Sequence, residues 1–291
     1  NRPCANTAVA MPEASSDFRT FVVRIRPGIY FADDPAFGGR RRELVAADYV
    51  YAIKRHFDPR WRSPRYADLA NNRLVGLEAV REAALRERRP FDYDREVEGL
   101  RALDRYTLQF RLERPNPRFA DELSDPSVVG AVAREVVEHY GDKIMEHPVG
   151  TGPFKLGTWR RSSLIAFDRN PGYREAVYDE EAPADDPLAQ AAVRALKGRR
   201  LPMVDRVEIS IIEQPQPRWL AFLNREMDIV WQVPEEFTGV AMPNDRLAPN
   251  LDKRGIYAIR YLRNDLVMSY FAMENPVVGG YTPDRIALRR A

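Results

Sequence analysis

The sequence predicts a mixed α/β protein, and three observations support this class. Residues 107–112 alternate between polar and apolar side chains, as half-buried strands do. Residues 46–57 repeat their apolar side chains with the period of a helix, and segments of the two kinds follow one another along the chain. The chain has 291 residues, of which 44% are apolar, and this is enough for about two domains with cores of their own.

Strands and helices are both expected in the first half of the chain. The clearest helix covers residues 46–57, because Tyr49, Ile53 and Phe57 recur at i, i+4 and i+8 and a proline two residues later ends the run. The same reasoning predicts further elements in this half: strands at 20–26, 29–31 and 107–112, and helices at 74–88 and 128–140.

The second half begins at a tight turn, residues 150–154, which leads into a strand. Residues 176–200 are rich in Ala, Asp, Glu and Pro, and we expect a surface insertion there with a short helix at 188–196. The patterns predict the following other elements: strands at 164–167, 207–212, 227–231, 257–262 and 266–273, and a helix at 219–224.

Both ends of the chain are expected to be cut. The first residue is Asn1 rather than Met, and no apolar segment of a signal peptide follows it. Thr282 and Pro283 are typical of a helix start, but the helical pattern then runs to Ala291 without a residue that would end it. We therefore expect a truncated chain, a piece of a longer protein.

Composition and motif spacing argue against several function classes. Lys and Arg total 45 and Asp and Glu total 43, so no polybasic nucleic-acid-binding arm is expected. Cys4 and three scattered histidines lack the spacing of a metal site, and we expect no metal and no other cofactor. The sequence contains no P-loop, dinucleotide fingerprint or nucleophile elbow, and neighbouring acids such as Asp33 and Asp34 point apart, so an enzyme is not expected.

Large apolar side chains gather at two places in the second half. Trp231 ends one predicted strand, and Tyr270, Phe271 and Met273 lie within another. Packing in a core and a wall facing a ligand explain these residues equally well, and both interpretations stay open at this point.

Several segments, taken together, resemble a known family. Residues 149–156 read V-G-T-G-P-F-K-L and are followed by Trp159 and by R-N-P-G-Y at 169–173, similar to the block G-T-G-P-F…W…R-N-P-x-Y. Residues 21–31 and 44–55 are similar to the strand, loop and helix that carry T-A-x-D-V-x-Y-S-x-x-R. The order and spacing of these blocks along nearly the whole chain identify it as similar to the family 5 extracellular solute-binding proteins, the oligopeptide-, dipeptide- and nickel-binding components of ABC importers.

The chain departs from the family pattern in a few places. The usual F-H-D-G reads F-A-D-D at residues 31–34, and residues 176–200 look inserted. Ala272 stands where the family has Asn, so a polar contact from that position is not expected. From the resemblance we expect that the family's signal peptide, first strands and most of its second lobe lie outside this chain.

The resemblance implies the periplasmic-binding-protein-like type II fold, in which two hinged lobes close on a ligand and a small α+β domain is added. Residues 1–149 would be mostly the small domain, and residues 150–266 most of the first lobe. Residues 267–291 would be the hinge crossing and the start of the second lobe. Tyr270, Phe271 and Met273 would then line the cleft near the hinge, with Trp231 at its edge.

The function that the resemblance implies is transport without chemistry. A monomer in the periplasm, or outside the cell at the membrane, would hold an extended oligopeptide between its lobes and deliver it to the membrane permease of an ABC importer. The same fold could instead bind another solute, such as a metal chelate, haem or an opine-like compound. An enzyme or a sensor that reuses the fold is the alternative from a different class.

Overall fold

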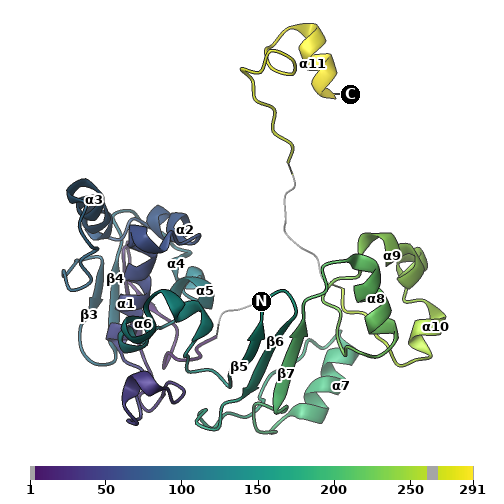
Figure 1. Cartoon of the computed structure of the whole chain (residues 1–291), viewed down its shortest axis with the longest axis horizontal. Coiled ribbons are helices and arrows are strands. Elements are labelled where there is room, and N and C mark those ends of the chain that lie inside the picture. Colours follow the sequence, from purple (N-terminus) through teal and green to yellow (C-terminus); the bar gives the residue numbers. More distant parts are fainter. Residues whose placement is uncertain (1–3, 261–267, 291) are drawn as a thin grey trace. The chain divides into compact units, whose positions relative to one another are not determined.

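The computed structural model describes residues 4–260 and 268–290. Two compact units can be distinguished, Asn1–Ile212 and Glu213–Ala291, and each is described by itself below. Both units are visible in Figure 1, which shows the mixture of helices and strands that the sequence predicts. The domain boundaries predicted at residues 149/150 and 266/267 stay a prediction.

A four-stranded antiparallel sheet organises the first part of the first unit. Its order is β1-β2-β4-β3. The strands are β1 (Glu13–Ala14), β2 (Thr20–Arg24), β3 (Leu100–Ala102) and β4 (Thr107–Arg111). Phe21 lies opposite Phe110 and Val23 opposite Leu108, so these four side chains share one face of the sheet, which faces the core.

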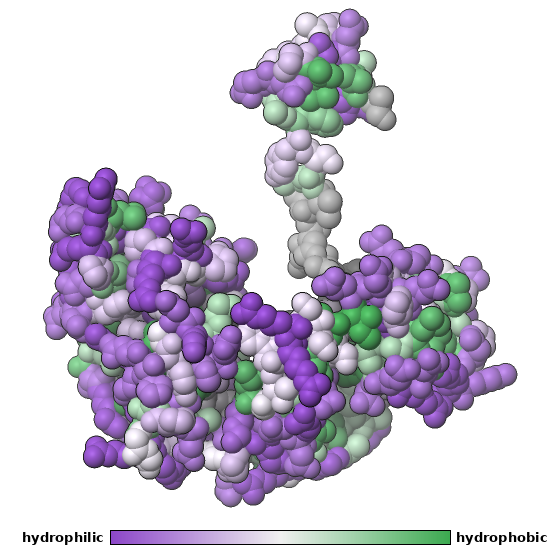
Figure 2. Space-filling view, in the orientation of Figure 1, coloured by the Kyte–Doolittle hydropathy of each residue, from purple (hydrophilic) through white to green (hydrophobic). Residues whose placement is uncertain are grey.

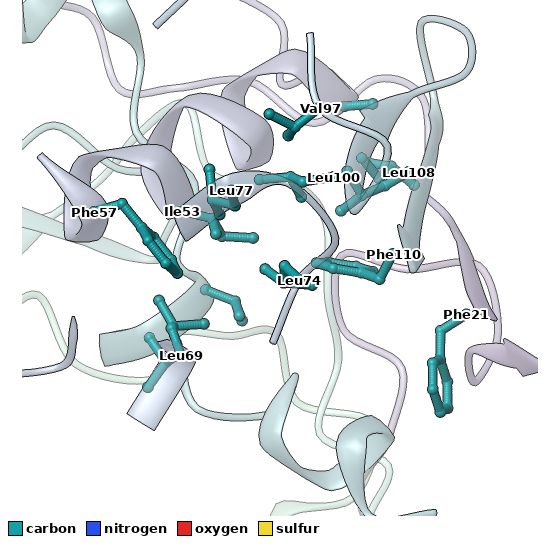
Figure 3. Close-up of a cluster of buried hydrophobic side chains, with 14 of the residues drawn as sticks. Phe21, Ile53, Phe57, Leu69, Leu74, Leu77, Val97, Leu100, Leu108 and Phe110 are labelled. Carbon is teal, nitrogen blue, oxygen red and sulfur yellow. The ribbon is translucent and has the colours of Figure 1, made fainter. Parts of the chain in front are cut away.

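Helices cover this face. They are α1 (Ala46–Phe57), α2 (Tyr66–Asn71), α3 (Leu77–Glu87), α4 (Phe119–Glu122), α5 (Pro126–Val129) and α6 (Arg134–Tyr140), with short 3-10 turns at Pro35–Phe37, Pro59–Trp61 and Gly141–Glu146. The predicted helix at 46–57 is confirmed residue for residue. Figure 3 shows Ile53 and Phe57 of α1 with Leu77 of α3 in the same cluster as Leu108 and Phe110 of β4, and all five are buried.

Two predicted elements of this part differ from the structure. The helix predicted at 128–140 is two helices, because Gly130 and Ala133 between them adopt extended backbone angles. The strand predicted at 29–31 is reduced to one bridge, in which Tyr30 pairs with Glu43. Among the residues that the structure describes, no second strand extends the ladder from this short segment.

A second antiparallel sheet follows, with the order β5-β6-β7. Its strands are β5 (Phe154–Arg160), β6 (Leu164–Arg169) and β7 (Arg206–Ser210), and α7 (Pro187–Leu196) lies between β6 and β7 in sequence. Asn170 is 5% exposed; its amide nitrogen donates to the Gly152 carbonyl at 2.9 Å and its amide oxygen accepts from the Gly172 N–H at 3.0 Å. This one side chain therefore joins the G-T-G-P-F turn to the R-N-P-G-Y turn at the ends of β5 and β6.

The second unit is helical in its described residues. Its elements are α8 (Pro215–Leu223), α9 (Glu235–Ala241), a 3-10 turn at Pro243–Asp245, α10 (Pro249–Asp252) and α11 (Pro283–Arg290). Trp219 is the centre of a small core with Ala241, Ala248 and Leu251, and its ring stacks on Phe237 with centroids 5.9 Å apart. The predicted helix start at Thr282-Pro283 is confirmed by α11.

The strands predicted at 227–231, 257–262 and 266–273 are not strands in the described residues, and residues 261–267 lie outside them. Val230 and Ile256 pack against the Trp219 core, whereas Ile229 and Tyr257 beside them are 76% and 69% exposed. The alternation that predicted strands is thus present. A strand also needs a hydrogen-bonded neighbour, and the structure shows none for these segments within its described part.

Arg42 connects the start of α1 to α6. Its guanidinium donates to Asp48 at 2.6 Å and to Glu135 at 2.8 Å, and Asp48, which is 3% exposed, also accepts from the Val45 N–H at 2.8 Å. Burial acts to lower the pKa of Arg42, but the hydrogen bonds to Glu135 and Asp48 outweigh it and raise that pKa. Burial raises the pKa of Asp48, and the hydrogen bond from Arg42 offsets only part of this.

We expect Arg42→Ala to lower the free energy of unfolding by about 3 kcal/mol, because it leaves the buried Asp48 carboxylate without its cation. Arg24→Ala is the matched control, since Arg24 and its partner Glu13 are both 61% exposed and the loss should be under about 1 kcal/mol. Urea unfolding followed by circular dichroism measures both. Equal losses in the two variants would contradict the role given to Arg42.

Tyr93 makes the protein sensitive to alkali. Its hydroxyl donates to Asp58 at 2.7 Å and accepts from the Trp61 indole at 3.0 Å. Burial, and then the hydrogen bond to Asp58, raise the pKa of Tyr93 well above its ordinary value. Above about pH 10 the unfolded chain therefore releases a proton that the folded chain keeps, and stability falls as the pH rises.

Above about pH 10, we expect the free energy of unfolding to fall with pH less steeply in Tyr93→Phe than in the wild type. The two slopes should differ by up to about 1.4 kcal/mol per pH unit, because the variant lacks this one proton. Tyr257→Phe, at a residue that is 69% exposed, is the control and should keep the wild-type slope. Urea unfolding at several pH values between about 8 and 11 gives the slopes. A Tyr93→Phe slope equal to that of the wild type would show that the folded protein does not hold this proton.

Candidate ligand-binding site

Trp231 lies between α8 and α9 of the second unit. Its neighbour Val230 packs against the Trp219 core, but the Trp231 side chain points away from that core and is 83% exposed. Core packing therefore does not account for this tryptophan in the described chain. A large exposed apolar side chain next to a buried one is a feature of surfaces that bind something.

Tyr270, Phe271 and Met273 form a second group, at the rim of a rigid turn. Tyr270 is 81% exposed and Phe271 44%, whereas Met273 is half-buried. The Met273 carbonyl accepts from the Gly280 N–H at 2.9 Å. A Cβ on Gly279 would meet the same carbonyl oxygen at 2.2 Å, so only glycine fits this close approach of the two backbone segments.

Residues 275 and 289 hold the turn in place. The Asn275 side chain accepts from the Val277 N–H at 2.8 Å. Arg289 of α11 donates to the carbonyls of Val278 and Gly280 at 2.7 and 2.8 Å. The two aromatic residues thus directly precede a turn that is held by hydrogen bonds from Asn275 and Arg289.

Tyr270, Phe271 and Met273 are neighbours in the sequence, and the structure gives no contact among their side chains within its described part. Trp231 belongs to the helical part of the second unit, on the other side of residues 261–267 in the sequence. The sequence prediction missed other exposed apolar residues near these four in the chain: Ile229, Tyr257, Ile259 and Met268. A sequence signal could have found them, because apolar residues stand on both faces of each predicted strand.

The exposed apolar side chains around α8 to α10 offer apolar contact. Figure 2 shows hydrophobic residues at the surface of the part that carries α8 to α10. Among the residues that the structure describes, no group of three or more His, Cys, Asp or Glu side chains could hold a metal ion. Exposed aromatic rings can stack on planar groups and cover apolar ones.

No helix in the described part of the chain is long and apolar enough to cross a membrane.

Comparison with known proteins identifies what this architecture is similar to. The model of the bacterial extracellular solute-binding proteins, family 5 Middle, matches residues 5–291. Di/tripeptide-binding protein 2 of Pseudomonas aeruginosa (strain UCBPP-PA14) is 25% identical over 279 residues, which cover 93% of this chain and 48% of that protein. The chain thus spans about half the length of this relative.

Solved structures show the same fold at lower identity. Haemophilus influenzae OppA in complex with the peptide RPPGFSPFR gives a TM-score of 0.59 at 20% identity, covering 86% of this chain and 40% of that one. AgaA of A. tumefaciens R10 in complex with agropinic acid gives a TM-score of 0.55 at 19% identity, covering 81% and 36%. Because the family model matches nearly the whole chain, this chain belongs to the bacterial extracellular solute-binding proteins of family 5.

Proposed function

We propose that the complete protein binds oligopeptides outside the cytoplasmic membrane and delivers them to the permease of an ABC importer, without making or breaking a bond. The observation that carries the proposal is the match to family 5 over residues 5–291. The names of the relatives add support, since a di/tripeptide-binding protein matches 93% of this chain and a peptide complex of OppA shares its fold.

In this proposal residues 1–149 form mostly the small domain, residues 150–266 most of the first lobe, and residues 267–291 the crossing into the second lobe. The protein acts as a monomer in the periplasm, or outside the cell at the membrane, and uses no cofactor, metal or nucleic acid. A ligand enters between two lobes that then close on it like a hinge.

Trp231, Tyr270, Phe271 and Met273 are proposed as the part of the cleft wall that this chain supplies. An extended peptide is held through its backbone, and aromatic side chains cover it when water is expelled. The exposure of Trp231 and Tyr270 supports this role, because 83% and 81% of these side chains are left to be covered by a ligand or a closing lobe. Such aromatic contacts are worth about 2 kcal/mol or more each in a well-packed, desolvated site.

We expect Trp231→Ala together with Phe271→Ala to weaken ligand binding by at least about tenfold in the complete protein. The control is Tyr281→Ala, which removes another aromatic side chain of the same unit that is 78% exposed and lies outside the proposed site. Calorimetry with the most abundant peptide that copurifies with the wild type measures the affinities. Unchanged affinity in the double variant would refute the site.

Native mass spectrometry of the complete protein, purified without refolding, tests the function itself. A mixed set of bound masses in the peptide range, released on denaturation, is the expected result. A single sharp adduct would instead identify a dedicated solute. Binding of a dedicated solute is the second candidate function, because AgaA, whose structure is a complex with agropinic acid, shares the fold. A protein that carries no adduct and binds no peptide in calorimetry would refute the proposal.

A further inference from the structure

The first unit contains a cavity of about 530 Å³ next to its main core. One wall is the core face of the four-stranded sheet, with Val23, Ile25, Leu108 and Phe110. The opposite side is formed by α4, α5 and the residues that follow them. Residues of the N-terminal segment between Cys4 and Pro12 line a third side, and the cavity is partly open to solvent. The volume is within the range of about 300–1,000 Å³ that is typical of pockets for small molecules.

The described residues that line this cavity are uncharged. None of the described residues that line it is Asp, Glu, Lys or Arg, although 30% of the whole chain is charged. An ion or a zwitterion that entered would lose its hydration without gaining a charged partner, and this costs several kcal/mol. Peptides with free termini are therefore poor ligands for the cavity, which separates it from the site proposed above.

Two hydroxyl groups meet at the cavity wall. The Thr7 hydroxyl of the N-terminal segment and the Tyr49 hydroxyl of α1 are 2.6 Å apart, and both residues are half-buried. One of them donates to the other, so the acceptor of that bond keeps its own O–H for a ligand. Burial raises the pKa of Tyr49, and its hydroxyl thus stays protonated at neutral pH.

The N-terminal segment is attached to the sheet edge by backbone hydrogen bonds, and the side chains of Thr7 and Asn6 bond to Tyr49 and Arg174. The Val9 N–H donates to the Arg24 carbonyl and the Arg26 N–H to the Thr7 carbonyl, both at 2.8 Å, around a bridge between Ala8 and Ile25. Displacing this segment would admit a ligand at the cost of these few bonds, while the hydrogen bonds within the helices stay in place.

We propose that this cavity binds a small neutral molecule that combines an apolar ring with one hydroxyl group. The ring lies against Val23, Leu108 and Phe110, and the hydroxyl group bonds to the Thr7–Tyr49 pair. The site shares no residue with the proposed peptide site, so each can fail in experiment without the other.

The test uses fluorine NMR on the complete protein with three probes: para-fluorophenol, fluorobenzene and para-fluorobenzoate. We expect para-fluorophenol to bind, and Tyr49→Phe to weaken it about fivefold while fluorobenzene binding stays the same. The charged para-fluorobenzoate should bind at least about tenfold more weakly than para-fluorophenol.

A cavity-filling variant locates the binding. Ala131→Leu adds bulk at a lining residue and should abolish binding of both neutral probes, whereas Ala47→Leu on the exposed side of α1 should leave it unchanged. Circular dichroism checks that each variant folds. The proposal is overturned if the wild type does not bind para-fluorophenol, if a folded Ala131→Leu variant binds it as the wild type does, or if para-fluorobenzoate binds equally well.

Discussion

The packing of the first unit depends on the charge that Arg42 brings to Asp48. The Asp48 carboxylate is 3% exposed and holds the first turn of α1, and its burial is tolerated because a guanidinium lies 2.6 Å away. The same guanidinium reaches Glu135 of α6, so one side chain fixes two helices that are far apart in sequence. The position of Ile53 and Phe57 over the sheet follows from how α1 begins.

Local periodicity was enough to predict some of the helices and strands of the first unit. The helix Ala46–Phe57 and the strand Thr107–Arg111 are where the apolar spacing places them. The helix expected at 128–140 is interrupted because Gly130 leaves the helical conformation, which a sequence count of apolar residues does not detect. At 227–231 the alternation is real, but strand formation depends on hydrogen bonds from another segment, and these are not encoded locally.

In the candidate site too, the sequence identifies the residue type, whereas the structure shows how far each side chain is exposed. Trp219 and Trp231 are both tryptophans in apolar surroundings of one unit, yet they are 5% and 83% exposed. Trp219 is buried because α8 turns it toward α9 and α10, whereas Trp231 follows a residue that already packs inward. The sequence could select the aromatic residues, but it could not tell how exposed each one is, and a ligand-facing role for the exposed ones stays a proposal.

The Asn170 junction has a consequence for how the family can diversify. The side chain bonds backbone groups of both turns, and the G-T-G-P-F and R-N-P-G-Y blocks are tied together through it in the described structure. The most recognisable signature in this chain therefore records how two strands are joined. Substitutions elsewhere in the chain can therefore accumulate without disturbing these two hydrogen bonds.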